Sequence, residues 1–196
     1  MNGEINKVLK GIDFGFGKIK GSVIRQAGYD FVIRYASHSP GKNLTKEEYE
    51  DFKRNSLLVG VVFETTTSRP LSGYGGGKQD GAFALKFVQE VTGEPRVIYF
   101  AVDADYNNDQ LQVIGEYFEG VAEALALHQI GVYGGYKTVQ YMLDNNLAAY
   151  AWQTYAWSHG HWDSRAQLRQ TDIYGPKLAG VACDTNESTS YDNGLF

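Results

Sequence analysis

Acidic residues stand where several short apolar runs of the sequence end. They are Asp13, Glu64, Asp103, Asp105 and Asp184. One acid in such a place is commonplace, because Asp caps helices and forms turns. Carboxylates that lie close together raise each other's pKa values, so one can keep its proton near neutral pH while another is ionised. Glycoside hydrolysis requires such a pair, and these five acids are therefore the candidate catalytic residues.

Aromatic side chains accompany the acids. The chain has 14 Tyr, 10 Phe and 3 Trp, and the segment from Trp152 to Trp157 is especially dense in them. Aromatic rings and amides are suited to stacking on a sugar and hydrogen bonding to its hydroxyl groups. We expect Trp152 to pack inside the fold. The candidate substrate-binding residues are Arg34, Tyr35, Tyr99, Tyr133, Gln153, Tyr155 and Trp157.

Several motifs for cofactors and metals are incomplete. Gly15 and Gly17 follow an apolar run, but Lys20 stands where a dinucleotide-binding fingerprint has its third glycine. Gly77-Lys78 lacks the other residues of a phosphate-binding loop. His159 and His161 could hold a metal, but no acid or cysteine stands at helical ligand spacing beside them, and three ligands are the usual minimum. We therefore predict no cofactor and no metal.

The elements that must position the acids read as alternating strands and helices. Eight strand candidates occur, at 8–13, 31–35, 57–63, 97–102, 130–133, 149–153, 168–170 and 180–184. Helices are predicted at 45–55, where Thr45 and Glu48 form a capping box, and near 79–92, 108–127 and 137–145, with a glycine-rich loop over 72–81. Alternation of this kind predicts a parallel sheet with helices outside it.

Eight such units favour an α/β fold, a compact (β/α)8 TIM-like barrel with reduced helices in its last third. An open doubly wound sheet is the main alternative. In a parallel barrel the carboxyl ends of all strands lie on one rim, which would bring the acids together. Because side chains alternate along a strand, Tyr99, Ala101, Asp103 and Asp105 would share one side of it while it stays extended.

Length and charge narrow the class of protein. The chain has 196 residues, so a single domain over residues 1–196 is expected. The net charge is −5 and there is no basic run, which argues against nucleic acid as a partner. No stretch is long and apolar enough to span a bilayer, and the segment Met1–Lys10 does not read as a secretory signal. We expect a monomer that reaches its target by release or export along another route.

Eight segments, in order along nearly the whole chain, resemble a family of glycoside-hydrolase-like domains of unknown function related to the family 25 lysozymes. They are 11–13, 28–35, 42–45 with Glu48, 61–64, 98–105, 131–136, 152–158 and 184–186. The resemblance implies a TIM-like barrel that acts on peptidoglycan, as phage endolysins and lysozyme-like muramidases do. It also implies roles for Asp13, Asp103 and Asp184, with Asp105 in the position usually held by the catalytic Glu.

Three functions stay open. The first is a peptidoglycan hydrolase in which Glu64 donates the proton, because Asp105 is one methylene shorter than Glu, and Asp103 or Asp105 acts as base, nucleophile or stabiliser. Asp13 and Asp184 would then tune pKa values and hold the substrate. The second is a glycan-binding barrel that has lost turnover. The third is a metal-dependent polysaccharide deacetylase that uses Asp103, Asp105 and a loop histidine.

Overall fold

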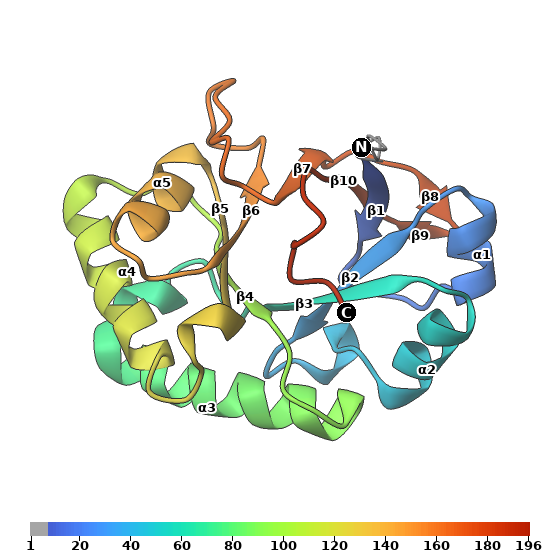
Figure 1. Ribbon diagram of the computed structural model, residues 1–196, viewed down its shortest axis with the longest axis horizontal. Coiled ribbons are helices and arrows are strands. Elements are labelled where there is room, and N and C mark those ends of the chain that lie inside the picture. The colour runs from blue at the N-terminus through green and yellow to red at the C-terminus, as the bar shows by residue number, and fades with distance from the viewer. Residues whose placement is uncertain (1–7) are drawn as a thin grey trace, which may run out of the picture.

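The computed structural model describes residues 8–196, so most of the Met1–Lys10 segment lies outside the described residues. Eight strands close into a barrel in the order β1-β10-β7-β6-β5-β4-β3-β2. They are β1 (Leu9–Asp13), β2 (Phe31–Ala36), β3 (Leu58–Phe63), β4 (Ile98–Val102), β5 (Ile130–Gly134), β6 (Tyr150–Thr154), β7 (Leu168–Asp172) and β10 (Asp184–Ser188). The closed α/β barrel confirms the predicted fold class and excludes the open sheet (Figure 1).

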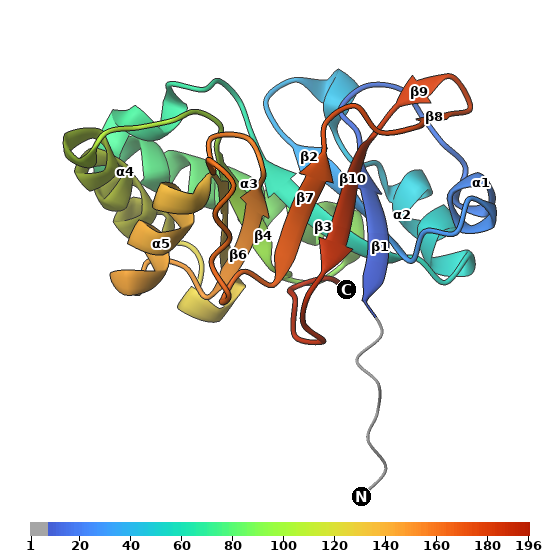
Figure 2. The same ribbon diagram turned by 90° about the horizontal axis from the view of Figure 1, so that it is seen from above.

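The eighth barrel strand runs against the others, and this corrects one prediction. From β1 through β2, β3, β4, β5 and β6 to β7, each strand is parallel to the next one round the barrel. The strand β10 closes the barrel and is antiparallel to both of its neighbours, β1 and β7 (Figure 2). The predicted strand 180–184 is instead part of a hairpin of β8 (Lys177–Leu178) and β9 (Val181–Ala182). Ala179 and Gly180 have φ of 49° and 84°, as a tight hairpin turn requires. Asp184 therefore begins its barrel strand.

Five α-helices flank the barrel: in Figure 1, α4 and α5 lie to its left, α3 below it, and α1 and α2 to its right. They are α1 (Gly21–Gln26), α2 (Lys46–Arg54), α3 (Gly73–Thr92), α4 (Asn108–Val121) and α5 (Tyr136–Asp144). The predicted capping box is present, because the Glu48 backbone N–H donates to Thr45 Oγ1 at 3.2 Å. Residues 155–183, all of them described, contain no α-helix, which confirms that the last third is short of helices.

The predicted glycine-rich loop over 72–81 is wrong, because α3 already begins at Gly73. The glycines of α3 allow it to pack closely against α4. A Cβ at Gly77 would lie 1.7 Å from the Tyr117 carbonyl oxygen, and one at Gly120 would lie 2.1 Å from that of Tyr74. Only residues without a side chain let α3 and α4 approach this closely, so glycine here serves contact between helices.

Side chains alternate between the barrel interior and the layer under the helices. The interior holds a small apolar cluster that consists of Phe31, Ile33, Val62, Tyr99, Ala101, Tyr133, Trp152 and Leu168. The larger cluster packs between strands and helices. Every second residue along a strand points into the barrel. At the carboxyl ends of the parallel strands this alternation places Asp13, Tyr35, Glu64 and Asp103 inside the mouth of the barrel.

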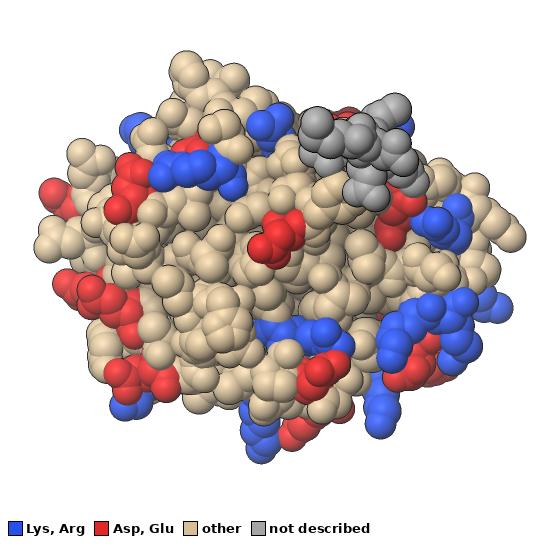
Figure 3. Space-filling view, viewed as in Figure 1, with Lys and Arg blue, Asp and Glu red and all other residues tan. Residues whose placement is uncertain are grey.

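The opposite, amino-terminal face of the barrel is the one seen in Figure 3. Basic and acidic side chains are interspersed around its periphery. Across residues 8–196, none of the helices combines the length and the hydrophobicity that a membrane crossing needs.

Candidate active site

Four of the five predicted acids gather at the mouth of the barrel. A cavity of about 320 Å³ opens there, with Glu64, Asp103 and Asp184 in its wall. Its other lining residues are Tyr35, Val62, Tyr133, Trp152, Ala156, Trp157, Gln170 and Ile173. Asp13 lies beneath it and is 2% exposed. We call this space the acid cavity. Since β10 and β4 are four strands apart in either direction round the barrel, Asp184 and Asp103 face each other across it.

Burial and like charge change the protonation of two of these acids. Asp13 and Asp184 are paired residues of β1 and β10. Burial, followed by the charge of Asp13, raises the pKa of Asp184 to about 7. Burial also raises the pKa of Asp13 to about 6, although two amide hydrogen bonds oppose the change. Near neutral pH the acid cavity therefore presents a protonated or half-protonated carboxyl group at Asp184.

Two amides that we did not single out from the sequence hold these carboxyl groups. Gln170 Nε2 donates to Asp13 at 3.0 Å and to Asp184 at 3.2 Å. Asn186 Nδ2 donates to Asp13 at 2.8 Å, and Asn186 Oδ1 accepts from the indole N–H of Trp152 at 2.8 Å. The alternation of side chains along a strand could have identified both amides. Gln170 is two residues beyond the apolar Leu168, and Asn186 is two residues beyond Asp184, so each shares the side of the strand on which that residue lies.

Glu64 lies in a different electrostatic setting. The Lys42 ammonium group donates to Glu64 Oε1 at 3.0 Å, and the two side chains are 25% and 20% exposed. Lys42 also lies 5.2 Å from the centre of the Tyr35 ring. Sequence reasoning did not select Lys42 as a site residue, because it lies in the loop after β2 rather than at a strand end. The ion pair makes Glu64 a poorer candidate proton donor than Asp184.

Asp103 and Asp105 do not act as a pair. Burial and the charge of Glu64 raise the pKa of Asp103, and Lys42 partly opposes this. The strand β4 ends at Val102, so the alternation expected to carry Asp105 to the same side does not extend to it. Asp105 is 44% exposed, lies 3.6 Å from His159 Nε2, and is absent from the lining of the acid cavity.

The predicted aromatic residues divide between two levels of the barrel. Tyr35, Tyr133 and Trp157 line the acid cavity. Burial, together with nearby carboxylates, raises the pKa of Tyr35 and of Tyr133 well above the ordinary value, so both remain hydrogen-bond donors. Tyr99 instead lies deeper, fully buried, and donates to the Asn193 carbonyl oxygen at 2.5 Å. A substrate at the mouth cannot reach it, and Tyr155 is 37% exposed but outside the cavity wall.

Arg34 faces away from the mouth. It shares the outward parity of Val32 on β2, is 1% exposed, and forms an ion pair with Glu48 of α2 at 3.3 Å. Its guanidinium group also donates to the carbonyl oxygens of Phe14 and Gly15. These contacts hold the loop after β1, and Arg34 is not among the residues that line the acid cavity.

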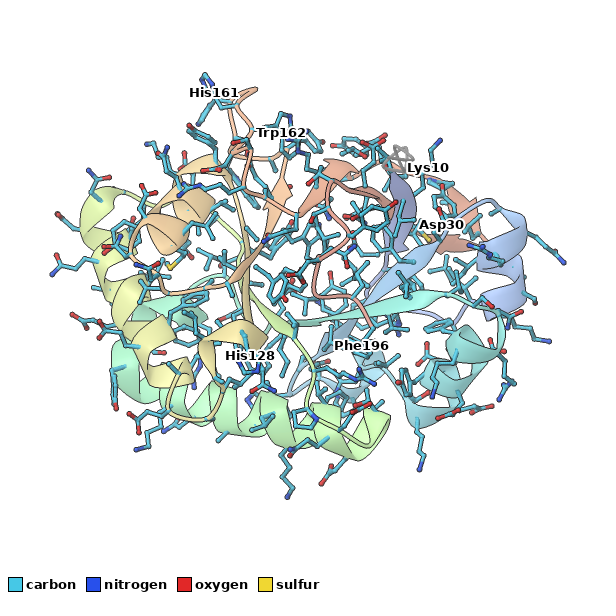
Figure 4. All side chains as sticks on the ribbon, viewed as in Figure 1. Lys10, Asp30, His128, His161, Trp162 and Phe196 are labelled. Carbon is cyan, nitrogen blue, oxygen red and sulfur yellow. The ribbon has the colours of Figure 1, made fainter. Side chains whose placement is uncertain are left out.

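Gln153 is likewise a support for a loop. It is fully buried; its Nε2 donates to Ser158 Oγ at 2.9 Å and to the His161 carbonyl oxygen at 2.8 Å. Ser158 Oγ also accepts from the Tyr136 backbone N–H at 3.0 Å and donates to the Thr154 carbonyl oxygen at 2.5 Å. The loop projects from the barrel, as the labelled His161 shows (Figure 4).

This support acts on Trp157, which lies next to Ser158 in the chain. Trp157 has φ of 56°, a conformation that is strained for a bulky residue. A Cβ at Gly135 would lie 3.0 Å from Trp157 Cβ and 3.1 Å from the Trp157 carbonyl oxygen, so glycine at this position leaves room for the backbone of Trp157. The hydrogen bonds of Ser158 thus hold an aromatic wall of the acid cavity in an unfavourable backbone conformation.

The arrangement of ligands does not suggest a metal centre. Within residues 8–196, no three or more His, Cys, Asp or Glu side chains are grouped so that they could hold a metal ion. His159 and His161 lie on the projecting loop, and His159 contacts Asp105 rather than the acids of the cavity. Nothing in this arrangement favours the deacetylase hypothesis.

Comparison with known proteins bears on both the fold and the site. Residues 22–188 match the family described as "Rv2525c-like, glycoside hydrolase-like domain". The chain is 26% identical over 190 residues to the Mycobacterium tuberculosis protein named "Putative peptidoglycan hydrolase Rv2525c". The alignment covers 90% of this chain and 79% of that protein. These matches confirm the family resemblance found in the sequence.

Two solved structures extend the comparison. The crystal structure of the Tat-secreted protein Rv2525c in complex with L-tartrate has a TM-score of 0.90 at 26% identity, covering 95% of this chain and 98% of that chain. A family 25 glycosyl hydrolase from Bacillus anthracis has a TM-score of 0.65 at 13% identity, covering 95% of this chain and 93% of that chain. The second likeness shows a shared fold.

Proposed function

Because the chain belongs to the Rv2525c-like, glycoside hydrolase-like domain family, we propose that it hydrolyses glycan strands of peptidoglycan in the acid cavity. The observation that carries this proposal is the pairing of unlike carboxyl groups. Asp184, with a pKa of about 7, lines the same cavity as Glu64, which is ion-paired with Lys42. Glycoside hydrolysis needs one carboxyl group that holds a proton and one that is charged.

In this proposal Asp184 is the proton donor to the glycosidic oxygen. A general acid works best when its pKa lies near the pH of the reaction, and Asp184 meets this condition. Glu64 and Asp103 directly follow the adjacent strands β3 and β4, on the other side of the mouth. They supply the negative charge that stabilises the developing positive charge on the sugar or activates water. Asp13, buried beneath, keeps the pKa of Asp184 high.

This assignment differs from the one expected from the sequence, in which Glu64 donates the proton. The reason is the Lys42 ammonium group at 3.0 Å from Glu64, which stabilises a charged carboxylate. Asp105 takes no part in the proposed chemistry. Tyr35, Tyr133 and Trp157 would contact the sugar, whereas Arg34, Tyr99 and Gln153 maintain the fold around it.

The experiment compares Asp184→Asn and Glu64→Gln with the unchanged protein, using release of reducing sugar from purified peptidoglycan. Each substitution should lower the rate by about 100-fold or more, the usual contribution of general acid or base catalysis. The rate should also fall as the pH rises through about 7, because Asp184 loses its proton. Asp109→Asn, at an exposed position of α4, is the matched control and should be unaffected. Full activity of Asp184→Asn would rule out its role as the donor.

A glycan-binding barrel without turnover is the second candidate function. The observation that favours it is Asp105, which stands where the family 25 lysozymes that the chain resembles have their catalytic Glu, and which is 44% exposed here. In this case the protein would sediment with insoluble peptidoglycan and release no reducing sugar. Binding would then depend on Trp157 and Tyr35 and would be indifferent to Asp184→Asn.

The site of action follows from the proposed substrate. The related Rv2525c is a Tat-secreted protein, and we infer that this chain acts on the cell wall after export or release. We further propose that residues 1–196 act as one domain and as a monomer, without nucleic acid as a partner. Sedimentation of the purified chain tests the monomer, and fractionation of producing cells tests the location.

A further inference from the structure

An aromatic residue of the barrel interior fixes the orientation of the amide group of Asn186. The indole N–H of Trp152 can donate a hydrogen bond but cannot accept one, and it donates to Asn186 Oδ1 at 2.8 Å. The amide nitrogen of Asn186 therefore points the other way, toward Asp13, to which it donates at 2.8 Å. Trp152 and Asn186 are 1% and 2% exposed, so bulk water has little access to this arrangement.

Tyr133 orients the amide group of Gln170 in a similar way. Because an ionised carboxylate can only accept hydrogen bonds, the nitrogen of Gln170 faces Asp13 and Asp184, and its oxygen faces the opposite direction. There Gln170 Oε1 accepts from the Tyr133 hydroxyl group at 2.9 Å. Each of the two amides is thus held by an aromatic donor at its oxygen and presents its nitrogen to the acids.

The two acids share these amide donors unequally. Asp13 Oδ2 accepts from Asn186 at 2.8 Å and from Gln170 at 3.0 Å. The hydrogen bond that Asp184 accepts from Gln170 is longer, at 3.2 Å. Hydrogen bonds donated to a carboxylate stabilise its charged form. The amides therefore favour a negative charge on Asp13 over one on Asp184.

Burial acts in the opposite direction. Asp13 is 2% exposed, whereas Asp184 is partly exposed in the wall of the acid cavity. Burial alone would leave the last proton of the pair on Asp13, since the charged form is disfavoured most where the group is buried most. Burial raises the pKa of Asp13 only to about 6 and that of Asp184 to about 7, because the hydrogen bonds from Asn186 and Gln170 lower the pKa of Asp13.

Other acids near the pair act on both of its members. Asp103 raises the pKa of Asp13 and that of Asp184. Glu64 further raises the pKa of Asp13, and Asp172 further raises that of Asp184. Burial raises the pKa of each of the other titratable neighbours, so these are uncharged near pH 7; they are Tyr35, Tyr133 and Cys183. The unequal hydrogen bonds are therefore the feature that favours ionisation of the more deeply buried acid.

We propose that Asn186 and Gln170, oriented by Trp152 and Tyr133, are positioning residues that keep the negative charge of the carboxyl pair on Asp13 and its last proton on Asp184. The proton is then carried by the acid that lines the cavity, where a glycosidic oxygen can reach it. This inference rests on the proposed function, in which Asp184 is the proton donor. It explains why the donor is the more accessible acid although burial favours the other one.

Carbon-13 NMR of the side-chain carboxyl groups tests which acid holds the proton. In a coupled pair, the size of the shift of each carboxyl carbon at each step gives the share of that group in the ionisation. In the unchanged protein the Asp13 signal should shift mainly near pH 6 and the Asp184 signal mainly near pH 7. Asn186→Leu, which nearly keeps the shape of Asn and lacks its donor, should raise the midpoint of Asp13 by about one pH unit or more.

Asn108→Leu, at the exposed first residue of α4, is the matched control and should leave both midpoints unchanged. If Asn186→Leu does not fold, because the indole N–H of Trp152 loses its partner, the order of the two shifts in the unchanged protein still decides the question. That measurement needs no substitution at the site.

Two results would overturn the proposal. One is an Asp13 signal that shifts at the later step in the unchanged protein, and the other is a folded Asn186→Leu variant with both midpoints unchanged. The proposed function would survive either result as long as Asp184→Asn and Glu64→Gln abolish hydrolysis of peptidoglycan. Conversely, if the unchanged protein releases no reducing sugar, the proposed function fails, while an Asp184 carboxyl group that ionises last would still support the placement of the proton.

Discussion

Replacing Asp184 by Asn should make the stability of the protein less dependent on pH. The folded state raises the pKa of Asp184 to about 7, whereas an unfolded Asp titrates near 3.9. A carboxyl group whose pKa is raised on folding contributes its full stability below about pH 4. This contribution is lost as the pH rises through about 7, because ionisation then costs more in the folded state than in the unfolded state.

The magnitude follows from the two pKa values. Ionisation of Asp184 disfavours the folded state by at most about 1.5 kcal/mol at pH 5 and about 4 kcal/mol at pH 8, and solvent lowers both values because the side chain is only partly buried. Asn cannot ionise and has nearly the same shape. The free energy of unfolding of Asp184→Asn, relative to that of the unchanged protein, should therefore be larger at pH 8 than at pH 5, by about 1–2.5 kcal/mol. Since Asp13 is coupled to Asp184, part of the gain would arise from easier ionisation of Asp13.

Urea unfolding at pH 5 and pH 8 measures this difference. The comparison between the two pH values cancels any fixed cost of the substitution, such as a weaker hydrogen bond from Gln170. Asp109→Asn, exposed at the start of α4, should give the same change at both pH values. If the Asp184→Asn difference between pH 5 and pH 8 is below about 0.5 kcal/mol, Asp184 is not a high-pKa group, and the proposed proton donor loses its physical basis.

Two further predictions concern the packing of the fold and of the loop that carries Trp157. Gly77→Ala should lower the free energy of unfolding by about 3 kcal/mol, because its Cβ would lie 1.7 Å from the Tyr117 carbonyl oxygen. Gly75→Ala, two residues away with no atom within 4 Å of its Cβ, should instead stabilise α3 by about 0.5–1 kcal/mol; equal effects of the two in urea unfolding would contradict the close contact of α3 and α4. Ser158→Ala removes three hydrogen bonds, two of them buried and one partly buried, and should cost about 2–4 kcal/mol. A loss below about 0.5 kcal/mol would show that Ser158 does not hold the loop.

The barrel and most of its acids could be predicted because their signals are local. The β-branched and aromatic runs mark strands, and an acid at the end of a parallel strand must reach the rim. The direction of β10 was not predicted, because the apolar residues 180–182 read as part of a strand that ends at Asp184. Whether such a run enters the barrel or folds back depends on the turn at Ala179 and Gly180 and on pairing with β1 and β7, residues distant in the sequence.

The roles of individual side chains were harder to predict than their positions. Arg34 and Gln153 were predicted to bind substrate, and this was wrong. They share the outward parity of Val32 and Ala151, a signal that the prediction did not use. Lys42, by contrast, reaches Glu64 only because the loop after β2 folds back over the rim, which is a tertiary contact. The same holds for the pKa of Asp184, which depends on Asp13 at the other end of the sequence.

The antiparallel direction of β10 also decides where the chain can be attached to something else. A barrel of eight parallel strands begins its first strand and ends its last at opposite ends. Here β1 starts and β10 finishes on the amino-terminal face, and Phe196 packs near the start of β3, with its backbone bonded to Val59. Both ends of the described chain therefore leave from the side away from the mouth (Figure 2). A purification tag, a solid support or a fused targeting module joined at either end would leave the entrance open to a polymer as large as a cell wall.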